Sequence, residues 1–297
     1  MKKKIKVVIL MGGKSSEREI SLLSGKEILA NIDKKKYTVK SLNIPDKRSN
    51  WIDKLKKIKP NVVFIALHGT YGEDGSVQGV LEHLGIPYTG SGILASAIGM
   101  DKRLFKKLMR YENIPVPKDT LKAPCFIKPS DQGSSVGASV VRTLDEFKKA
   151  VKLAKKYSEN IIVEEYLRGK DITCGVIGNK NPIALPLIEI RANKGSFFNY
   201  KSKYEKEGAE EIVPAPISKS LTRKIQKLSL KVFEVVGCRG FARIDFILKK
   251  NGSPVVLEIN TIPGMTKMSL VPKAAGAAGL SYTKLIDKII NYAIEKR

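Results

Sequence analysis

The chain has 297 residues, of which 42% are hydrophobic and 28% charged, a composition typical of a globular protein with two or three domains. Its formal net charge of +25 raises the alternative of a nucleic-acid-binding protein. The lysines are spread along the whole chain, however, and no basic run is interleaved with aromatic side chains. A lysine-rich solvated surface is therefore favoured over a nucleic-acid partner.

Cysteine usage and the N-terminal segment predict the compartment. Cys125, Cys174 and Cys238 have no metal-ligand spacing and leave an odd thiol, which is typical of a reducing compartment. The apolar run 7–11 is too short for a signal peptide, no small-residue cleavage site follows it, and no stretch approaches the length of a membrane span. We therefore expect a cytoplasmic protein without a membrane partner.

The first third of the chain alternates strand and helix patterns, which predicts a small doubly wound α/β domain over residues 1–95. Expected strands are 5–11, 37–44 and 62–67, and expected helices are 16–30 and 78–84. The segment 16–19 has capping-box spacing. No G-x-G-x-x-G pattern follows the first strand, so a dinucleotide-binding oxidoreductase is disfavoured.

Two residues of this domain are candidate ligand groups. Glu17, in the first turn of a helix, either complements the helix dipole or offers a carboxylate at the carboxyl end of a strand. His68 opens a polar glycine-rich loop, 68–75, directly after a strand. A purely structural role would suit either residue, but the position of His68 favours the site.

The central part of the chain predicts a phosphate-binding loop. After a helix over 101–111 and a proline linker, an apolar strand carries Lys128 into a Ser/Gly-rich loop ending at Gly137. Backbone N–H groups and hydroxyls of such a loop can hold a phosphate, and the flanking strands argue against a flexible linker. It is not a Walker A loop, because the lysine precedes the glycines.

The remaining elements predict two further α/β domains, over 96–180 and 181–297. A capping box at Thr143 opens an amphipathic helix, and strands are expected at 161–167, 172–177 and 183–190 in an antiparallel sheet. Residues 197–216 are polar and have no period, which is typical of an active-site loop; we expect 195–214 to close over a site. A helix should end at Gly237.

The segment 239–264 is the most informative, because two apolar runs flank Asn251-Gly252, the signature of a type I′ hairpin. That turn pairs Lys250 with Ser253, so Asp245 faces Glu258 and Arg243 faces Asn260. Opposed carboxylates repel each other unless a cation lies between them. Two carboxylates and a carboxamide suit Mg²⁺ or Mn²⁺, which predicts a metal site at Asp245, Glu258 and Asn260.

The alternative is a solvent-facing strand pair with ordinary surface charges. It does not explain why the opposite face of the hairpin is wholly apolar, with Ala242, Ile244, Phe246, Leu257 and Ile259.

Several motifs occur in one order along nearly the whole chain: GGKSSEREIS at 12–21, HG and GEDG within 68–75, YTGSG at 88–92, MDK at 100–102, KP and GSSVG within 128–137, YKSKY at 200–204 and LEINTIPGM at 257–265. Together they resemble the D-alanine–D-alanine ligase family of the ATP-grasp superfamily. Another ATP-grasp ligase would share the hairpin but lack Glu17, His68 and the 200–204 loop. The linker between Pro117 and Lys128 is shorter than usual in the family.

The resemblance implies the ATP-grasp fold of three α/β domains and a homodimer. It implies ATP-dependent ligation of two D-alanines to D-alanyl-D-alanine through a D-alanyl phosphate, releasing ADP and phosphate, for peptidoglycan synthesis. ATP would be the co-substrate, with two Mg²⁺ (or Mn²⁺) ions.

The resemblance also assigns site residues. The metal ligands would be Asp245, Glu258 and Asn260, in agreement with the hairpin register. ATP would be bound by Lys102, Lys128, Ser135, Glu164, Glu165, Tyr166, Leu167, Asp171 and Lys203. The first D-alanine would meet Glu17, His68, Ser134 and Tyr204, the last of which favours a dipeptide product. Arg243 and Gly264 would stabilise the oxyanion, and Ser269 and Leu270 would bind the second substrate.

Overall fold

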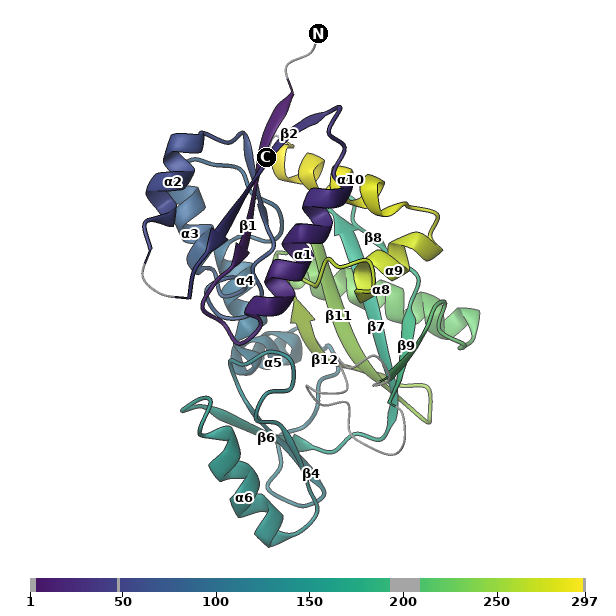
Figure 1. Cartoon of the computed structure of the whole chain (residues 1–297). Coiled ribbons are helices and arrows are strands. Elements are labelled where there is room, and N and C mark those ends of the chain that lie inside the picture. The colour runs from purple at the N-terminus through teal and green to yellow at the C-terminus, as the bar shows by residue number, and fades with distance from the viewer. Residues whose placement is uncertain (1–3, 47–48, 193–208, 296–297) are drawn as a thin grey trace.

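The computed structural model describes residues 4–46, 49–192 and 209–295. Three sheets form the framework (Figure 1): a parallel sheet near the N-terminus, a large antiparallel sheet beside it, and a small sheet that projects away from both. The expected residues Lys203 and Tyr204 and most of the 195–214 loop lie outside the described residues.

The N-terminal unit is the predicted parallel sheet, with strand order β2-β1-β3. Its elements are β1 (Ile5–Gly12), α1 (Arg18–Asn31), β2 (Tyr37–Ile44), α2 (Trp51–Ile58), β3 (Val62–Ile65) and α3 (Ser76–His83). Helix α2 was not predicted from the sequence. The predicted capping box at 16–19 is wrong, because Glu17 is the N-cap residue and no side chain caps the helix.

The small central sheet is antiparallel, as predicted, with order β5-β4-β6. It follows α4 (Ile93–Met100) and α5 (Lys102–Tyr111) and consists of β4 (Cys125–Pro129), β5 (Ser139–Val141) and β6 (Ile161–Glu165), with α6 (Leu144–Ala154) packed on one face. Helix α4 was not predicted from the sequence. Asp101 caps α5 by accepting hydrogen bonds from the N–H groups of Arg103 and Leu104.

The predicted capping box at Thr143 is confirmed, with both reciprocal hydrogen bonds to Glu146 present. We expect Thr143→Ala to lower the free energy of unfolding by about 1 kcal/mol, because the hydrogen bond to the Glu146 N–H is lost. Urea denaturation of the variant against wild type measures the effect. Thr143→Ser keeps the hydroxyl and should stay near wild type; an equal loss in both variants would contradict the capping role.

Within the residues that the structure describes, the large sheet has six strands: β10-β9-β7-β11-β12 in order, with β8 paired to β7. Its elements are β7 (Gly169–Gly178), β8 (Ile183–Ala184), β9 (Ile188–Ala192), β10 (Ala209–Ile212), α8 (Lys219–Val236), β11 (Gly240–Lys249), β12 (Pro254–Asn260), α9 (Leu270–Ala277) and α10 (Tyr282–Ile294). Helix α8 ends at Gly237 as predicted. The single strand expected over 183–190 is two strands, and β10 occupies part of the stretch expected to be irregular.

Strand β7 pairs with β11 along its whole length, so it belongs to the large sheet. The expected central domain, 96–180, includes β7. The domain limits remain a prediction; strand pairing favours a boundary between β6 and β7.

The hairpin of β11 and β12 reaches the predicted register by a different route. The N–H of Lys249 donates to the Ser253 carbonyl, so the turn has three residues and ends at Gly252 with φ 77°, and the predicted type I′ turn is wrong. This shifts the register by one residue. Leu257 has no partner on the opposite strand, and this β-bulge shifts the register back by one residue.

Asp245 therefore faces Glu258, and Arg243 faces Asn260, as predicted. Leu257 is partly exposed and lines a cavity, so its predicted place on the buried face is wrong.

One hydrophobic core joins the N-terminal and large sheets. It combines Val7 and Phe64 from the parallel sheet with Ile177 from β7 and Ile289 from α10. Figure 1 shows α10 beside α1, where the two sheets meet. The carboxyl end of β1 and the hairpin are thereby held in a constant relation. Within the described residues, no helix has the length and apolarity needed to span a membrane.

Candidate active site

A cavity of about 500 Å³ lies where the three sheets converge. Its lining includes Glu17 and His68 from the N-terminal unit, Lys128 from the central sheet, and Asp245 and Glu258 from the hairpin. The sequence therefore places its candidate residues on separate elements, and the fold gathers them around one space.

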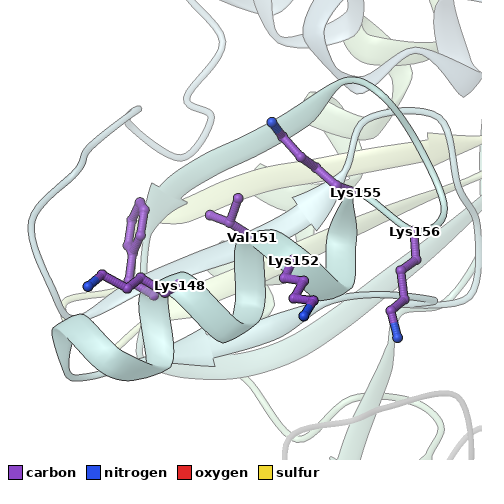
Figure 2. Close-up of a pocket in the computed structure, with 6 residues that line it drawn as sticks. Lys148, Val151, Lys152, Lys155 and Lys156 are labelled. Carbon is purple, nitrogen blue, oxygen red and sulfur yellow. The ribbon is translucent and has the colours of Figure 1, made fainter.

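A second hollow, of about 550 Å³, lies along α6 (Figure 2). It is lined by Phe147, Val151 and four lysines, Lys148, Lys152, Lys155 and Lys156. Its lining has no carboxylate and shares no residue with the first cavity. We therefore place the active site at the first cavity.

The hairpin carries the predicted acidic pair on its cavity side. Arg243 holds Asp245 through two hydrogen bonds, Nε to Oδ1 at 2.8 Å and Nη2 to Oδ2 at 2.7 Å. The Thr173 hydroxyl donates to Asp245 Oδ1 at 2.6 Å. Glu258 Oε2 lies 3.5 Å from the Lys102 ammonium. The carboxylates are thus placed by partners on two strands, β7 and β11, and on helix α5.

The donor set fits a hard divalent cation. Asp245 and Glu258 occupy opposed positions on paired strands, and Asn260, whose Oδ1 accepts the Ile262 N–H, is two residues from Glu258. Oxygen ligands of this kind suit Mg²⁺ or Mn²⁺. The described part of the chain contains no cluster of three or more His, Cys, Asp or Glu side chains. A cation here would therefore need further oxygen ligands from water or a phosphate.

Two lysines face the acidic pair, Lys102, which is buried, and Lys128, which is mostly buried. Lys102, the first residue of α5, donates to the Gln132 carbonyl at 2.8 Å and so ties α5 to the Ser/Gly-rich loop. Lys128, on β4, forms an ion pair with Glu164 Oε1 at 2.7 Å. Burial lowers the pKa of Lys128, but the carboxylates of Glu164 and Glu258 outweigh burial and leave that pKa raised. Lys128 is therefore a cation at neutral pH.

Glu164, which is expected to meet the nucleotide, lines the cavity with its side chain buried between two lysines. Lys128 binds one carboxylate oxygen and Lys106 the other, at 3.0 Å. Burial raises the pKa of Glu164, yet the two lysines more than offset burial and hold that pKa low. Lys106 was not among the sequence candidates. Its signal was its place one helical turn after Lys102.

Four other expected nucleotide-binding residues, Glu165, Tyr166, Leu167 and Asp171, line the cavity at the crossing from β6 to β7. Glu165 Oε1 also accepts a hydrogen bond from the Lys118 N–H. This crossing links the small sheet directly to the large one, since β6 and β7 are consecutive strands.

Glu17 contacts the Ser/Gly-rich loop across the cavity. Ser134 donates its hydroxyl to Glu17 Oε1 at 2.9 Å. A Cβ at Gly133 would lie 2.6 Å from the same oxygen, so any larger residue would require the Glu17 carboxylate to shift. Ser134 and Ser135 both have positive φ, of 50° and 58°. The strained loop conformation places the expected residues Ser134 and Ser135 in the cavity wall.

His68 is buried and is part of a hydrogen-bonded network. Nδ1 donates to the Ile262 carbonyl at 3.0 Å, and Nε2 lies 3.0 Å from the Ser24 hydroxyl. Ser24 also accepts the Met265 N–H at 3.3 Å, which connects α1 to the segment after the hairpin. Glu73 Oε1 lies 3.5 Å from His68 Nδ1. Sequence reasoning missed Ser24 and Glu73 as partners of His68.

Burial lowers the pKa of His68, but the carboxylates of Glu73 and Glu17 and the Ile262 carbonyl together outweigh burial, and the resulting pKa is raised. A raised folded-state pKa stabilises the fold fully below the unfolded value of about 6.5, and this contribution is lost as the pH rises through the folded pKa. We expect Glu73→Gln to destabilise the protein by about 1–3 kcal/mol at pH 6 and by less at pH 9.

Urea unfolding of wild type and Glu73→Gln at both pH values measures this difference. The chain has two histidines, and His83 is unchanged in both proteins. A destabilisation that is the same at pH 6 and pH 9 would contradict the ion pair between His68 and Glu73.

The segment after the hairpin contributes hydroxyl groups to the cavity. Ser269 is the N-cap of α9, and its hydroxyl accepts the Thr266 N–H at 3.1 Å and lies 2.8 Å from the Thr266 hydroxyl. Gly264, Thr266, Ser269 and Leu270 all line the cavity. The N-terminus of α9 therefore faces the same space as the acidic pair, a place suited to a carboxylate.

Comparisons with known proteins agree along the whole chain. The family model for the D-ala D-ala ligase C-terminus matches residues 95–291, and that for the N-terminus matches residues 6–61 and 47–91. A D-alanine–D-alanine ligase from Pelotomaculum thermopropionicum is 41% identical over 313 residues, covering 98% of this chain and 97% of the relative.

Solved structures are also similar. The D-alanine–D-alanine ligase from Bacillus anthracis complexed with ATP has a TM-score of 0.84 and 35% identity, covering 98% of this chain and 97% of that one. The VanG D-Ala:D-Ser ligase from Enterococcus faecalis has a TM-score of 0.87 and 30% identity, covering 98% and 100%. These likenesses confirm the ATP-grasp fold expected from the motifs. By sequence and by structure, the chain belongs to the D-alanine–D-alanine ligase family.

Proposed function

We propose that this protein ligates two D-alanines to D-alanyl-D-alanine with ATP, releasing ADP and phosphate, as part of peptidoglycan synthesis. The observation that carries the proposal is the meeting of the Asp245–Glu258 pair with Lys102 and Lys128, opposite Glu17, in one cavity. Family membership supports the same reaction.

The first step brings a carboxylate oxygen of D-alanine to the γ-phosphorus of ATP, while the bond from that phosphorus to ADP breaks. Both reactants are anions, so the step requires cations that neutralise charge and hold the groups in line. Lys102 and Lys128 supply two fixed cations. Glu17, with its carboxylate oriented by Ser134, binds the ammonium of this first D-alanine.

We propose that two divalent ions, Mg²⁺ or Mn²⁺, are bound by Asp245, Glu258 and Asn260. When bound, the ions would neutralise phosphate oxygens and hold the nucleotide for in-line transfer. The chain's own part is to fix the carboxylates: Arg243 and Thr173 orient Asp245, and Lys102 lies beside Glu258.

In the second step, the amine of another D-alanine attacks the carbonyl carbon of D-alanyl phosphate, and phosphate leaves with its bonding electrons. Negative charge develops on the carbonyl oxygen, and we propose that Arg243 and the Gly264 N–H stabilise it. Ser269 and Leu270, at the start of α9, bind the carboxylate of the second D-alanine. Because water would hydrolyse the acyl phosphate, the reaction needs an enclosed site.

We further propose that Ser135, Glu165, Tyr166, Leu167 and Asp171 contact the nucleotide, that His68 orders the first-substrate site, and that the protein is a cytoplasmic homodimer. The lining of the cavity supports the contacts. The reducing compartment is supported by the cysteines, none of which forms a disulfide.

The test is phosphate release and product analysis with ATP, Mg²⁺ and D-alanine, and with L-alanine as control. We expect D-alanyl-D-alanine from D-alanine alone. D-serine and D-lactate are offered in competition as second substrates, because one similar structure is a D-Ala:D-Ser ligase. A mixed product in place of the dipeptide would revise the second substrate, and no ATP-dependent product would refute the proposal.

A further inference from the structure

Lys106 is a buried cation without a role in the chemistry described so far. It lies on α5 four residues after Lys102, so both side chains emerge on one side of the helix. The Lys106 side chain is 3% exposed, and its ammonium lies 2.7 Å from Asp119 Oδ1 and 3.0 Å from Glu164 Oε2. A buried lysine with two carboxylate partners is not a surface charge.

Glu164 transmits the position of Lys106 to the phosphate site. Its side chain is 3% exposed, and its two oxygens are divided between Lys106 and Lys128. Glu164 lies on β6 and Lys128 on the neighbouring strand β4, so the carboxylate bridges α5 and the small sheet. The orientation of Lys128 thus depends on a carboxylate that Lys106 holds from the other side.

The short linker before β4 completes the arrangement. Asp119 pairs with Glu164 in an isolated antiparallel bridge, and the Thr120 N–H donates to the Val163 carbonyl. Asp119 also binds Arg110 at 2.7 Å. The linker therefore pairs with the edge of β6 and fixes the position of Glu164, whose carboxylate binds Lys106.

Charge balance indicates what Lys106 does for Lys128. Without Lys106, Glu164 and Lys128 would form a neutral buried ion pair, and the Lys128 ammonium would stay bound to the Glu164 carboxylate. With Lys106 present, the Glu164 and Asp119 carboxylates are matched by three cations, Lys128, Lys106 and Arg110, which leaves one net positive charge in the cluster. That surplus is available to an anionic phosphate.

We propose that Lys106 is a positioning residue for nucleotide binding: it neutralises Glu164 and so allows Lys128 to serve the phosphates of ATP. The inference rests on the proposed function, because it takes ATP as the ligand of Lys128. Lys106 itself does not contact the nucleotide. It connects the helix that carries Lys102 to the strand that carries Lys128, so one pair of charges aligns both phosphate-binding lysines.

The test compares Lys106→Met with Lys107→Met, the same change at the exposed neighbouring position on α5. We expect Lys106→Met to raise the KM for ATP on the order of tenfold, with less than about twofold change in the KM for D-alanine. Calorimetric titration with ADP in the presence of Mg²⁺ should show the same loss of affinity. Lys107→Met should behave as wild type, and Lys106→Arg, which keeps the charge, should recover part of the affinity.

A double-mutant cycle separates positioning from a general loss of stability. In a Glu164→Gln background no buried carboxylate needs neutralisation, so adding Lys106→Met should change the KM for ATP by less than about twofold. The double variant lacks the charges of both Lys106 and Glu164. It can therefore be compared with Glu164→Gln even if Lys106→Met alone folds poorly.

Three results would overturn the inference: an unchanged KM for ATP in folded Lys106→Met, an equal rise in both KM values, or the same effect in both backgrounds. Wild type that binds ADP but makes no D-alanyl-D-alanine would instead refute the proposed function, and ADP titration would still decide the role of Lys106.

Discussion

Glu258→Gln is expected to lower kcat for ligation by at least about a hundredfold. The change replaces one of two opposed carboxylates by a neutral amide of the same size. It weakens the proposed divalent cation site and removes the charge beside Lys102, 3.5 Å away. Steady-state phosphate release with saturating ATP and D-alanine measures kcat, and Mn²⁺ titration followed by electron paramagnetic resonance measures cation binding in the presence of ADP.

The fold should survive this change. The Glu258 side chain is partly exposed, so its ion pair adds little to stability, and the free energy of unfolding should change by less than about 1 kcal/mol. Glu234→Gln, on the exposed side of α8, is the matched control and should keep full activity. Near-normal turnover by Glu258→Gln would show that the acidic pair is not the catalytic centre.

Glu17→Gln is expected to raise the KM for the first D-alanine by about a hundredfold, because the ammonium loses a charged partner in a water-poor site. The Ser134 hydroxyl, now 2.9 Å from Glu17 Oε1, can still donate to the amide oxygen, so the loop should stay in place. The affinity for ADP, measured by calorimetry, should therefore remain close to wild type.

Glu19→Gln is the control for this prediction, since Glu19 lies two residues away in the first turn of α1 and is exposed. If the helix dipole were the reason for Glu17, both changes would reduce stability alike and neither would affect the KM for D-alanine. A KM for D-alanine that is unchanged in Glu17→Gln would remove Glu17 from the substrate site.

The hairpin illustrates a correct prediction reached for an incomplete reason. A two-residue turn assumed at Asn251-Gly252 placed Asp245 opposite Glu258, and the structure confirms the pair. The assumed two-residue turn is absent, and the bulge at Leu257 compensates for the longer turn. Because a shift of one residue reverses the faces of a strand, only the combination of both irregularities keeps the carboxylates in register.

The sequence by itself determined the parallel arrangement of the first strands, the capping box at Thr143 and the acidic pair of the hairpin. These features depend on local periods and on residues close together in the chain, where spacing alone decides which side chains meet. The family motifs, which occur in one order along the chain, added the predicted residues that surround the cavity, including Glu17 and Ser134, which lie 117 residues apart.

Only the tertiary structure decided which charges are paired across elements. Lys106 and Glu164 are 58 residues apart, and Ser24 and His68 are 44 apart. Helix α5 has many basic residues. Lys106 and Lys107 are adjacent residues of the same type, yet Lys106 is buried against the Glu164 carboxylate and Lys107 is exposed. No local pattern distinguishes them, because the difference depends on where β6 and the linker at Asp119 pack against the helix.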